Sequence, residues 1–151
     1  VIRSLPLEQI VKPAVRKYAP MFISKKLSLE MSSLTATVLT DEKWAQFIIE
    51  QILSNSLKYT RTGSIRIWQK DPAALIIEDT GIGIDPADIP RLGERGFPGY
   101  NGRLDKKSTG IGLYLCKEIS RRLSHTLTIE SEPGKGTRVT IDFATRQLQA
   151  E

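Results

Sequence analysis

The order in which helix-like and strand-like periodicities follow one another constrains the fold of this chain more than any other feature of the sequence. Apolar residues three and four apart predict a helix over residues 7–22, which Pro13 should weaken or kink. Segments 25–31 and 35–41 are rich in strand-forming residues, and a polar turn separates them. The chain is therefore expected to open with one helix and two short strands.

The middle of the chain predicts a second helix and a hairpin. Asp41 can cap this helix, and its buried stripe is expected to consist of Ala45, Ile49, Ile52, Leu53 and Leu57. Residues 63–70 and 73–79 then predict two strands that are joined across Asp71-Pro72.

The last part of the chain predicts a long loop, a helix and a closing pair of strands. Residues 81–109 are rich in Gly, Pro and charge, and long loops in compact domains are usually functional. Segments 125–132 and 137–143 alternate like an antiparallel pair. Before them, a helix is marked by apolar residues four apart, namely Ile111, Leu115, Ile119 and Leu123. The whole order contains no regular βαβ alternation, so we expect an α+β fold of two layers, with helices on one face of a mixed sheet.

Size and composition limit the organisation of the chain. A length of 151 residues with 40% hydrophobic residues fits one domain over residues 1–151, and no apolar run approaches the roughly 20 residues of a membrane span. The first residue is Val rather than Met, so we interpret the chain as a fragment of a longer parent. The Lys and Arg residues are spread along the chain and interleaved with 17 carboxylates, so an anionic nucleotide or an acidic protein partner explains the net charge of +5 as well as nucleic acid does. The only cysteine, Cys116, fits a reducing compartment and a place in the core.

A polar pair near the end of the second helix is the first candidate for chemistry. Asn55 and Lys58 are three residues apart and share a helix face that borders the buried stripe. The Asn55 carbonyl oxygen suits Mg²⁺, and Lys58 would bring positive charge to phosphates. For these two residues alone, a solvated helix face is the simpler explanation.

Two glycine-containing segments are the next candidates. Residues 79–84, DTGIGI, follow an apolar strand, where a carboxylate can accept a hydrogen bond from an amine and glycines let the backbone approach a flat ring. Residues 108–113, STGIGL, open the last helix, where free N–H groups and the helix dipole can bind an anion. Taken singly, an ordinary turn and an ordinary capped helix explain these segments as well.

Five motifs in order resemble the N, G1, F, G2 and terminal glycine boxes of the catalytic domain of sensor histidine kinases: SNSLKYT, EDTGIGI, RGFPGYNGR, STGIGLYLCK and EPGKGT. That domain belongs to an ATPase superfamily shared with gyrase, heat-shock-90 and mismatch-repair proteins, and the resemblance implies its Bergerat-type ATP-binding fold. More narrowly, GFPGYNGR followed by DKKSTGIGLYLCK resembles short-sensor kinases that work with transporters against peptide antibiotics such as bacitracin. The implied cofactors are ATP and Mg²⁺.

The resemblance also implies a role for each matching residue. Asn55 would be the Mg²⁺ ligand, Lys58 a phosphate contact and Asp79 the acceptor for adenine N6. Segment 96–109 would be a lid over ATP, anchored by Phe97. The catalytic residues would be Asn55, Lys58 and Arg103, the last of which would reach the terminal phosphates. The other members of the nucleotide site would be Tyr59, Gly81, Gly83, Ile84, Lys107, Ser108, Thr109, Gly110, Gly112, Leu113 and Thr137.

Two residues, Gln51 and His125, differ from the pattern of that family. Gln51 stands where many members of that family carry Asn, and its longer arm disfavours direct contact with the metal but leaves a water-mediated role open. His125, the only histidine, lies at the start of a predicted strand and lacks the acidic neighbour of the family's histidine box. We therefore do not expect His125 to accept a phosphoryl group.

The function implied by the resemblance is donation of the γ-phosphoryl group of ATP to a histidine on the dimerisation domain of the same parent. The implied setting is the cytoplasmic part of a cell-membrane sensor kinase, with a response regulator and a transporter complex as partners and no nucleic acid. The alternatives are a nucleotide-gated interaction module and a slow ATPase. An ATPase needs a carboxylate base, but Glu50 lies five residues before Asn55, about 140° around the helix, which argues against hydrolysis.

Overall fold

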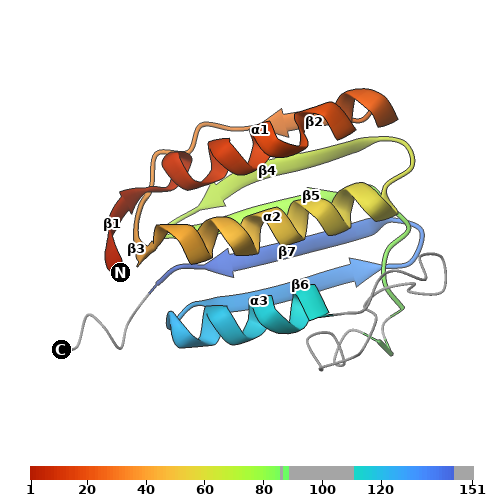
Figure 1. The fold of residues 1–151 in the computed structure, drawn as a ribbon. Coiled ribbons are helices and arrows are strands. Elements are labelled where there is room, and N and C mark those ends of the chain that lie inside the picture. The colour runs from red at the N-terminus through yellow and green to blue at the C-terminus, as the bar shows by residue number, and fades with distance from the viewer. Residues whose placement is uncertain (86, 89–110, 145–151) are drawn as a thin grey trace.

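The computed structural model describes residues 1–85, 87–88 and 111–144, which form two layers (Figure 1). Three helices lie side by side over one face of a sheet: α1 (Leu7–Lys25), α2 (Glu42–Tyr59) and α3 (Ile111–Arg122). The sheet consists of β2 (Ser28–Met31), β4 (Ser64–Lys70), β5 (Ala74–Asp79), β6 (Thr126–Glu132) and β7 (Gly136–Asp142). The expected α+β fold is confirmed.

The five-stranded sheet is mixed and has the order β2-β4-β5-β7-β6. Only β2 and β4 are parallel, and the other three neighbouring pairs are antiparallel. The predicted hairpin is β4–β5, which turns at the cis Asp71-Pro72 bond, and the predicted closing pair is β6–β7. Both β5 and β7 therefore lie in the middle of the sheet, where one face is covered by helices.

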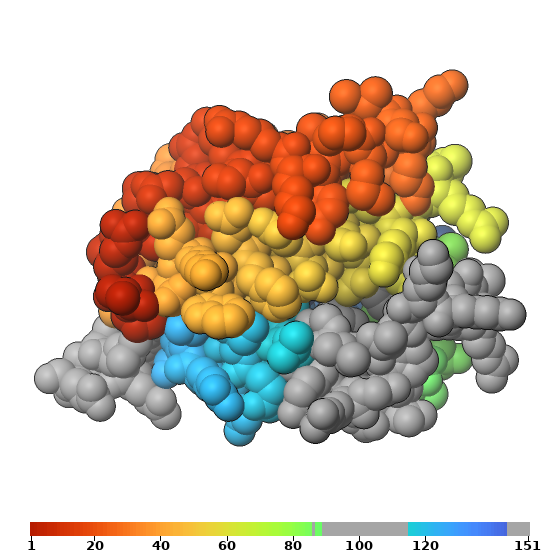
Figure 2. Space-filling view, in the orientation of Figure 1, coloured from red at the N-terminus to blue at the C-terminus, as the bar shows by residue number. Residues whose placement is uncertain are grey.

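Helix-facing residues of the central strands form the core with the apolar stripes of the helices. On the sheet side these residues are Ile65, Ile67, Leu75, Ile77, Val139 and Ile141, all of which are buried. Burial of each large aliphatic side chain contributes about 1.5–3 kcal/mol. In the space-filling view, α1 and α2 form a continuous surface over this layer (Figure 2).

The predicted start and stripe of α2 are confirmed. Asp41 Oδ1 accepts a hydrogen bond from the Trp44 N–H at 3.0 Å, which satisfies one of the free donors in the first turn. The predicted stripe is buried against the sheet and α1.

The structure corrects the expectations for the N-terminal part of the chain. The helix continues past Pro13 and Pro20 and ends at Lys25, because its buried apolar stripe offsets the missing backbone donors. A strand that the periodicity did not predict, β1 (Ile2–Pro6), pairs with β3 (Thr37–Asp41) as a separate antiparallel ribbon.

Leu115 of the predicted α3 stripe lies outside the core. Leu115 is 39% exposed, whereas Cys116 is fully buried and Leu123 is buried. A step of four residues advances about 40° beyond a full helical turn, so residues spaced four apart drift around the helix. Cys116 therefore takes the inner position and is a core residue, as expected.

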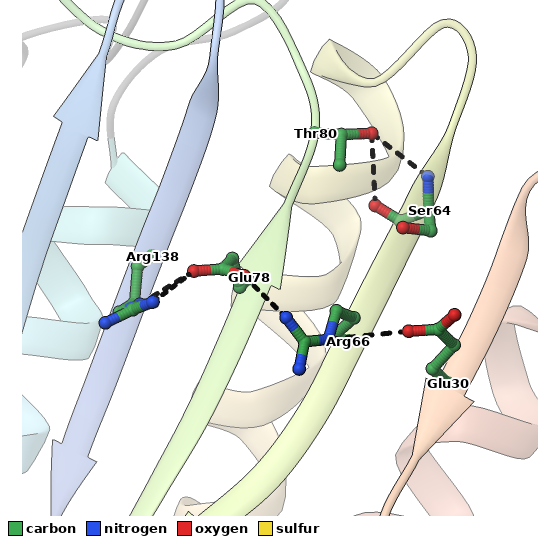
Figure 3. Close-up of polar contacts among 6 residues, drawn as sticks. All are labelled: Glu30, Ser64, Arg66, Glu78, Thr80 and Arg138. Atoms are coloured by element: carbon green, nitrogen blue, oxygen red, sulfur yellow. Dashed lines mark hydrogen bonds and ion pairs between the residues drawn. The ribbon is translucent and has the colours of Figure 1, made fainter.

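The face of the sheet away from the helices has a row of alternating charges (Figure 3). We call Glu30, Arg66, Glu78 and Arg138 the outer row, since they stand opposite one another on β2, β4, β5 and β7. Arg138 contacts Glu78 at 2.6 Å, and Arg66 lies 3.4 Å from both Glu78 and Glu30. Both guanidinium groups also stack over the ring of Trp68, at 4.8 and 5.4 Å.

Within the described residues, no helix combines the length and the apolar composition of a membrane span.

Candidate functional site

Three polar side chains lie in one row on the helix-facing side of the sheet. Asp79 is the last residue of β5 and stands opposite Thr137 of β7, which stands opposite Ser131 of β6. We call Asp79, Thr137 and Ser131 the inner row. Asp79 is only 3% exposed and Thr137 only 4%, so a carboxylate is buried at the edge of the apolar core. Such a group must be satisfied by hydrogen bonds or by a ligand.

The donors that reach the Asp79 carboxylate are neutral. Its Oδ1 atom accepts from the N–H groups of Gly81 at 2.9 Å and Thr137 at 3.2 Å, and the Ser56 hydroxyl also donates to the carboxylate. Burial raises the pKa of Asp79 above its ordinary value, although the three hydrogen bonds act in the opposite direction. The result is a fixed acceptor suited to an amine on a ligand.

The last turns of α2 lie against the end of β5. Ser56 of α2 bonds to Asp79, and the Tyr59 carbonyl accepts from the Ile82 N–H at 3.1 Å. Asn55 is half-buried, Lys58 is exposed and Tyr59 is buried. The structure therefore brings this polar edge of α2 to the same end of the molecule as Asp79, as the predicted site requires.

Segment 79–84 is also held by the turn between β6 and β7. The Ile84 N–H donates to Ser131 Oγ at 2.7 Å, and the Gly134 N–H donates to the Ile82 carbonyl at 2.8 Å. Ile84 itself is fully buried. The segment is thus fixed between α2 on one side and the β6–β7 turn on the other.

The two glycines of this segment are required by close backbone contacts. A Cβ at Gly81 would lie 2.4 Å from the Tyr59 carbonyl oxygen. Gly83 has a φ of +77°, and a Cβ there would lie 2.2 Å from the Glu132 carbonyl oxygen. These contacts account for both glycines from the fold itself, and admission of a flat base stays a prediction.

Comparison with known proteins decides the family. Residues 40–147 match the family described as histidine kinase-, DNA gyrase B- and HSP90-like ATPase, which is more than half of the chain. The chain belongs to this ATPase family. The resemblance predicted from the five motifs is confirmed.

Relatives of this ATPase-family chain include named sensor kinases. It is 35% identical over 151 residues to the sensor histidine kinase YxdK of Bacillus subtilis (strain 168), with 96% of this chain and 46% of that protein covered. The chain spans less than half the length of YxdK and of the sensor protein BceS of the same organism, to which it is 34% identical.

Solved structures share its fold at low sequence identity. The catalytic domain of histidine kinase ThkA has a TM-score of 0.81 at 14% identity, covering 96% of each chain. Full-length ShkA in complex with AMPPNP has a TM-score of 0.76 at 19% identity, covering 95% of this chain and 32% of ShkA.

Six predicted site residues lie outside the described residues: Phe97, Arg103, Lys107, Ser108, Thr109 and Gly110. They include the predicted anchor of the lid, Phe97, and the predicted catalytic residue Arg103. Gly112 and Leu113 lie within α3.

Two members of the site were not predicted from the sequence, Ser56 and Ser131. Ser56 is four residues after Ile52 in the buried stripe of α2, and Ser131 alternates with Leu127 and Ile129 on the inner face of β6. In both cases the available signal was a hydroxyl residue at a position that the periodicity assigns to the core.

Glu50, the possible base for an ATPase, and His125, the only histidine, both contact other residues of the fold. Glu50 accepts from Lys17 at 2.8 Å and from Gln46 at 2.9 Å, within the packing of α1 against α2. His125 is buried after α3, where its Nε2 atom lies 2.8 Å from Thr40 Oγ1 and its ring packs edge-on against Phe143. Burial lowers the pKa of His125 to about 4.

Proposed function

We propose that this chain is the ATP-binding catalytic domain of a sensor histidine kinase. It binds Mg·ATP and donates the γ-phosphoryl group to a histidine on a separate dimerisation domain of the same parent. In that transfer an imidazole nitrogen attacks the γ-phosphorus, the bond to the bridging oxygen breaks, and ADP leaves. The protein supplies mainly alignment and charge stabilisation.

The observation that supports this proposal most directly is the buried Asp79 carboxylate with its neutral donors. A fixed acceptor at the end of β5 suits the exocyclic amine of adenine and would repel the O6 atom of guanine. The family match and the AMPPNP bound to the similar fold of ShkA agree with an adenine nucleotide as the ligand. Calorimetry with equal affinities for ATP and GTP would remove Asp79 from this role.

The donor set on α2 suits Mg²⁺ rather than a metal held wholly by the protein. No group of three or more His, Cys, Asp or Glu side chains gathers within the described residues. Mg²⁺ is usually bound by one or two protein oxygens together with phosphate oxygens and water. The Asn55 amide oxygen would supply the protein ligand and Lys58 the charge beside the phosphates, and the ion would neutralise charge on the transferred group.

The slow-ATPase alternative is disfavoured by the surroundings of Glu50. Its carboxylate is engaged by Lys17 and Gln46 beside α1, so it does not serve as a base for water beside Asn55. A nucleotide-gated interaction module would bind ATP in the same way and differ only in the absence of transfer. Transfer itself must therefore be measured.

The deciding experiment supplies radiolabelled Mg·ATP to the chain with and without a dimerisation domain that carries a histidine box. We expect acid-labile label on the added domain only. His125 follows a helix of 12 residues, about 18 Å long, and its ring is buried. Label that forms without the added domain and disappears in His125→Gln would overturn the proposal.

We further propose that the parent is a membrane sensor kinase with a response regulator and a transporter complex as partners. The support is the resemblance of residues 96–103 and 105–117 to the short-sensor kinases. The sequence that precedes this chain in its parent tests the point, since it should contain membrane spans and a histidine box.

A further inference from the structure

Ser131 makes three hydrogen bonds at the edge of the candidate site. Its Oγ atom lies 2.7 Å from the Ile84 nitrogen, 2.8 Å from the Gly136 carbonyl oxygen and 2.8 Å from Thr137 Oγ1. Through these contacts Ser131 connects segment 79–84, the start of β7 and the hydroxyl of Thr137. Ser131 is itself half-buried and shares the helix-facing side of the sheet with Asp79.

The direction of each hydrogen bond follows from the atoms involved. A serine hydroxyl has one proton and two lone pairs. The Gly136 carbonyl can only accept, so it takes the Ser131 proton, and the Ile84 N–H can only donate, so it fills one lone pair. The remaining contact must then be donation from Thr137 Oγ1–H to Ser131 Oγ.

This assignment fixes the hydrogen-bonding character of Thr137. Since its proton points to Ser131, only the lone pairs of Thr137 Oγ1 can serve a ligand. The backbone N–H of the same residue donates to Asp79 Oδ1 at 3.2 Å, which places the hydroxyl beside the carboxylate. Asp79 and Thr137 therefore form an edge of acceptors, which suits a base that presents an amine and repels one that presents a carbonyl oxygen.

We propose that Ser131 is a positioning residue that sets the base preference of the nucleotide site. It does so by holding the Thr137 hydroxyl as an acceptor and by fixing segment 79–84 through Ile84. The inference rests on the proposed function, since it requires the base to lie at Asp79. Ser131 is not expected to touch the nucleotide.

The test compares the Mg·ATP and Mg·GTP affinities of the unchanged chain, Ser131→Ala and Ser131→Thr by calorimetry. Without Ser131, the Thr137 hydroxyl can rotate and donate to a carbonyl oxygen. We expect Ser131→Ala to lower the ATP-to-GTP preference about tenfold, in keeping with one hydrogen bond reversed in a buried site. Ser131→Thr keeps the hydroxyl and should restore the preference.

Two further variants separate this role from general damage. Thr128→Ala removes an exposed hydroxyl from the same strand and should leave both affinities unchanged. Thr137→Val combined with Ser131→Ala should lack the gain in relative GTP affinity, because no hydroxyl is left to donate. If Ser131→Ala does not fold, Ser131→Cys repeats the test, since a thiol is only a weak donor and acceptor.

The outcomes distinguish the two proposals. If the unchanged chain does not bind Mg·ATP, the proposed function fails and this inference fails with it. If the unchanged chain prefers ATP and Ser131→Ala keeps that preference, or weakens ATP and GTP binding equally, the assignment to Ser131 is wrong while the proposed function stands.

Discussion

The inner and outer rows lie on opposite faces of the sheet and share strands β5 and β7, where Glu78 and Asp79 are neighbours, yet these two carboxylates have different surroundings. Glu78 of the outer row lies on the open face and is paired with two guanidinium groups. Asp79 of the inner row is buried and is held by two backbone N–H groups and a serine hydroxyl. The outer carboxylate is already paired with cations of the protein, whereas the donors to the inner one within the described residues are neutral groups. Cations on one face and neutral donors on the other thus separate a structural acid, Glu78, from Asp79, the acid that we propose to bind the base.

The largest expected effect comes from removing the inner charge alone. Asp79→Asn keeps an oxygen acceptor for Gly81 and Thr137 but loses the charge, and we expect Mg·ATP affinity to fall about 100-fold, the range of a hydrogen bond to a charged group. The folded pKa of Asp79 is raised, so the ionised form costs stability at neutral pH, and the variant should melt at an equal or higher temperature. Calorimetry and thermal melting check the two parts, and a variant that melts lower and still binds ATP contradicts both.

The next largest effect is expected from His125, another buried ionisable group, which should make the free energy of unfolding depend on pH. The pKa of His125 falls from 6.5 to about 4, so the neutral ring stabilises the fold fully above pH 6.5, and this contribution is lost as pH falls toward 4. Between pH 7 and 4.5 the loss should be about 2 to 3 kcal/mol. Urea denaturation at both pH values should show a smaller decrease for His125→Gln, and equal decreases would exclude His125 as the cause.

A similar comparison can be made on α2, between Glu50, whose carboxylate is paired with Lys17, and Asn55, whose side chain is neutral. Asn55→Ala should weaken nucleotide binding about tenfold in the presence of Mg²⁺ and leave metal-free binding unchanged, because the amide oxygen serves the ion. Glu50→Gln is the matched control on the same helix, since its carboxylate is engaged by Lys17. If Asn55→Ala unfolds, or binds Mg·ATP like the unchanged chain, the assignment of Asn55 is wrong. If its binding in EDTA falls equally, the amide does not act through the metal.

The smallest effect is expected from the outer row. Glu78→Gln should lower the free energy of unfolding by less than about 1 kcal/mol, and less at high salt, because exposed ion pairs are weak and screened. Its Mg·ATP affinity should stay within about twofold of the unchanged chain, the opposite of its neighbour Asp79. A large loss of ATP affinity would mean that the two faces are not independent.

Local signals predicted the parts of the fold whose partners are close in sequence. The Asp41 cap, the β4–β5 hairpin and the β6–β7 pair each depend on residues that lie near one another in the chain. The β1–β3 ribbon could not be found in this way, because Leu5 pairs with Val38 across an entire helix. Periodicity reports which face of an element is apolar, and it does not identify a distant partner.

The candidate site follows the same division. Asp79 was predicted from its place after an apolar strand, and its burial and donors agree with a fixed acceptor. Ser131 was not predicted, because its contact with Ile84 forms only when β6 lies beside segment 79–84. A serine in an alternating strand gives no sign of which chain segment it will meet.

If Asp79 binds the base as proposed, the consecutive acids at the end of β5 also make nucleotide binding sensitive to the register of the strands. Successive residues of a strand point to opposite faces, so a slip of one position would exchange Glu78 and Asp79. Glu78 would then enter the apolar layer beneath the helices, and Asp79 would meet the two arginines. A molecule with this error would lose its acceptor for the base at the same moment as it lost its core packing. A nucleotide affinity column should therefore retain only protein molecules whose strands are correctly paired. A one-residue insertion at Asp71-Pro72 is a direct way to produce molecules with shifted pairing, which the column should not retain.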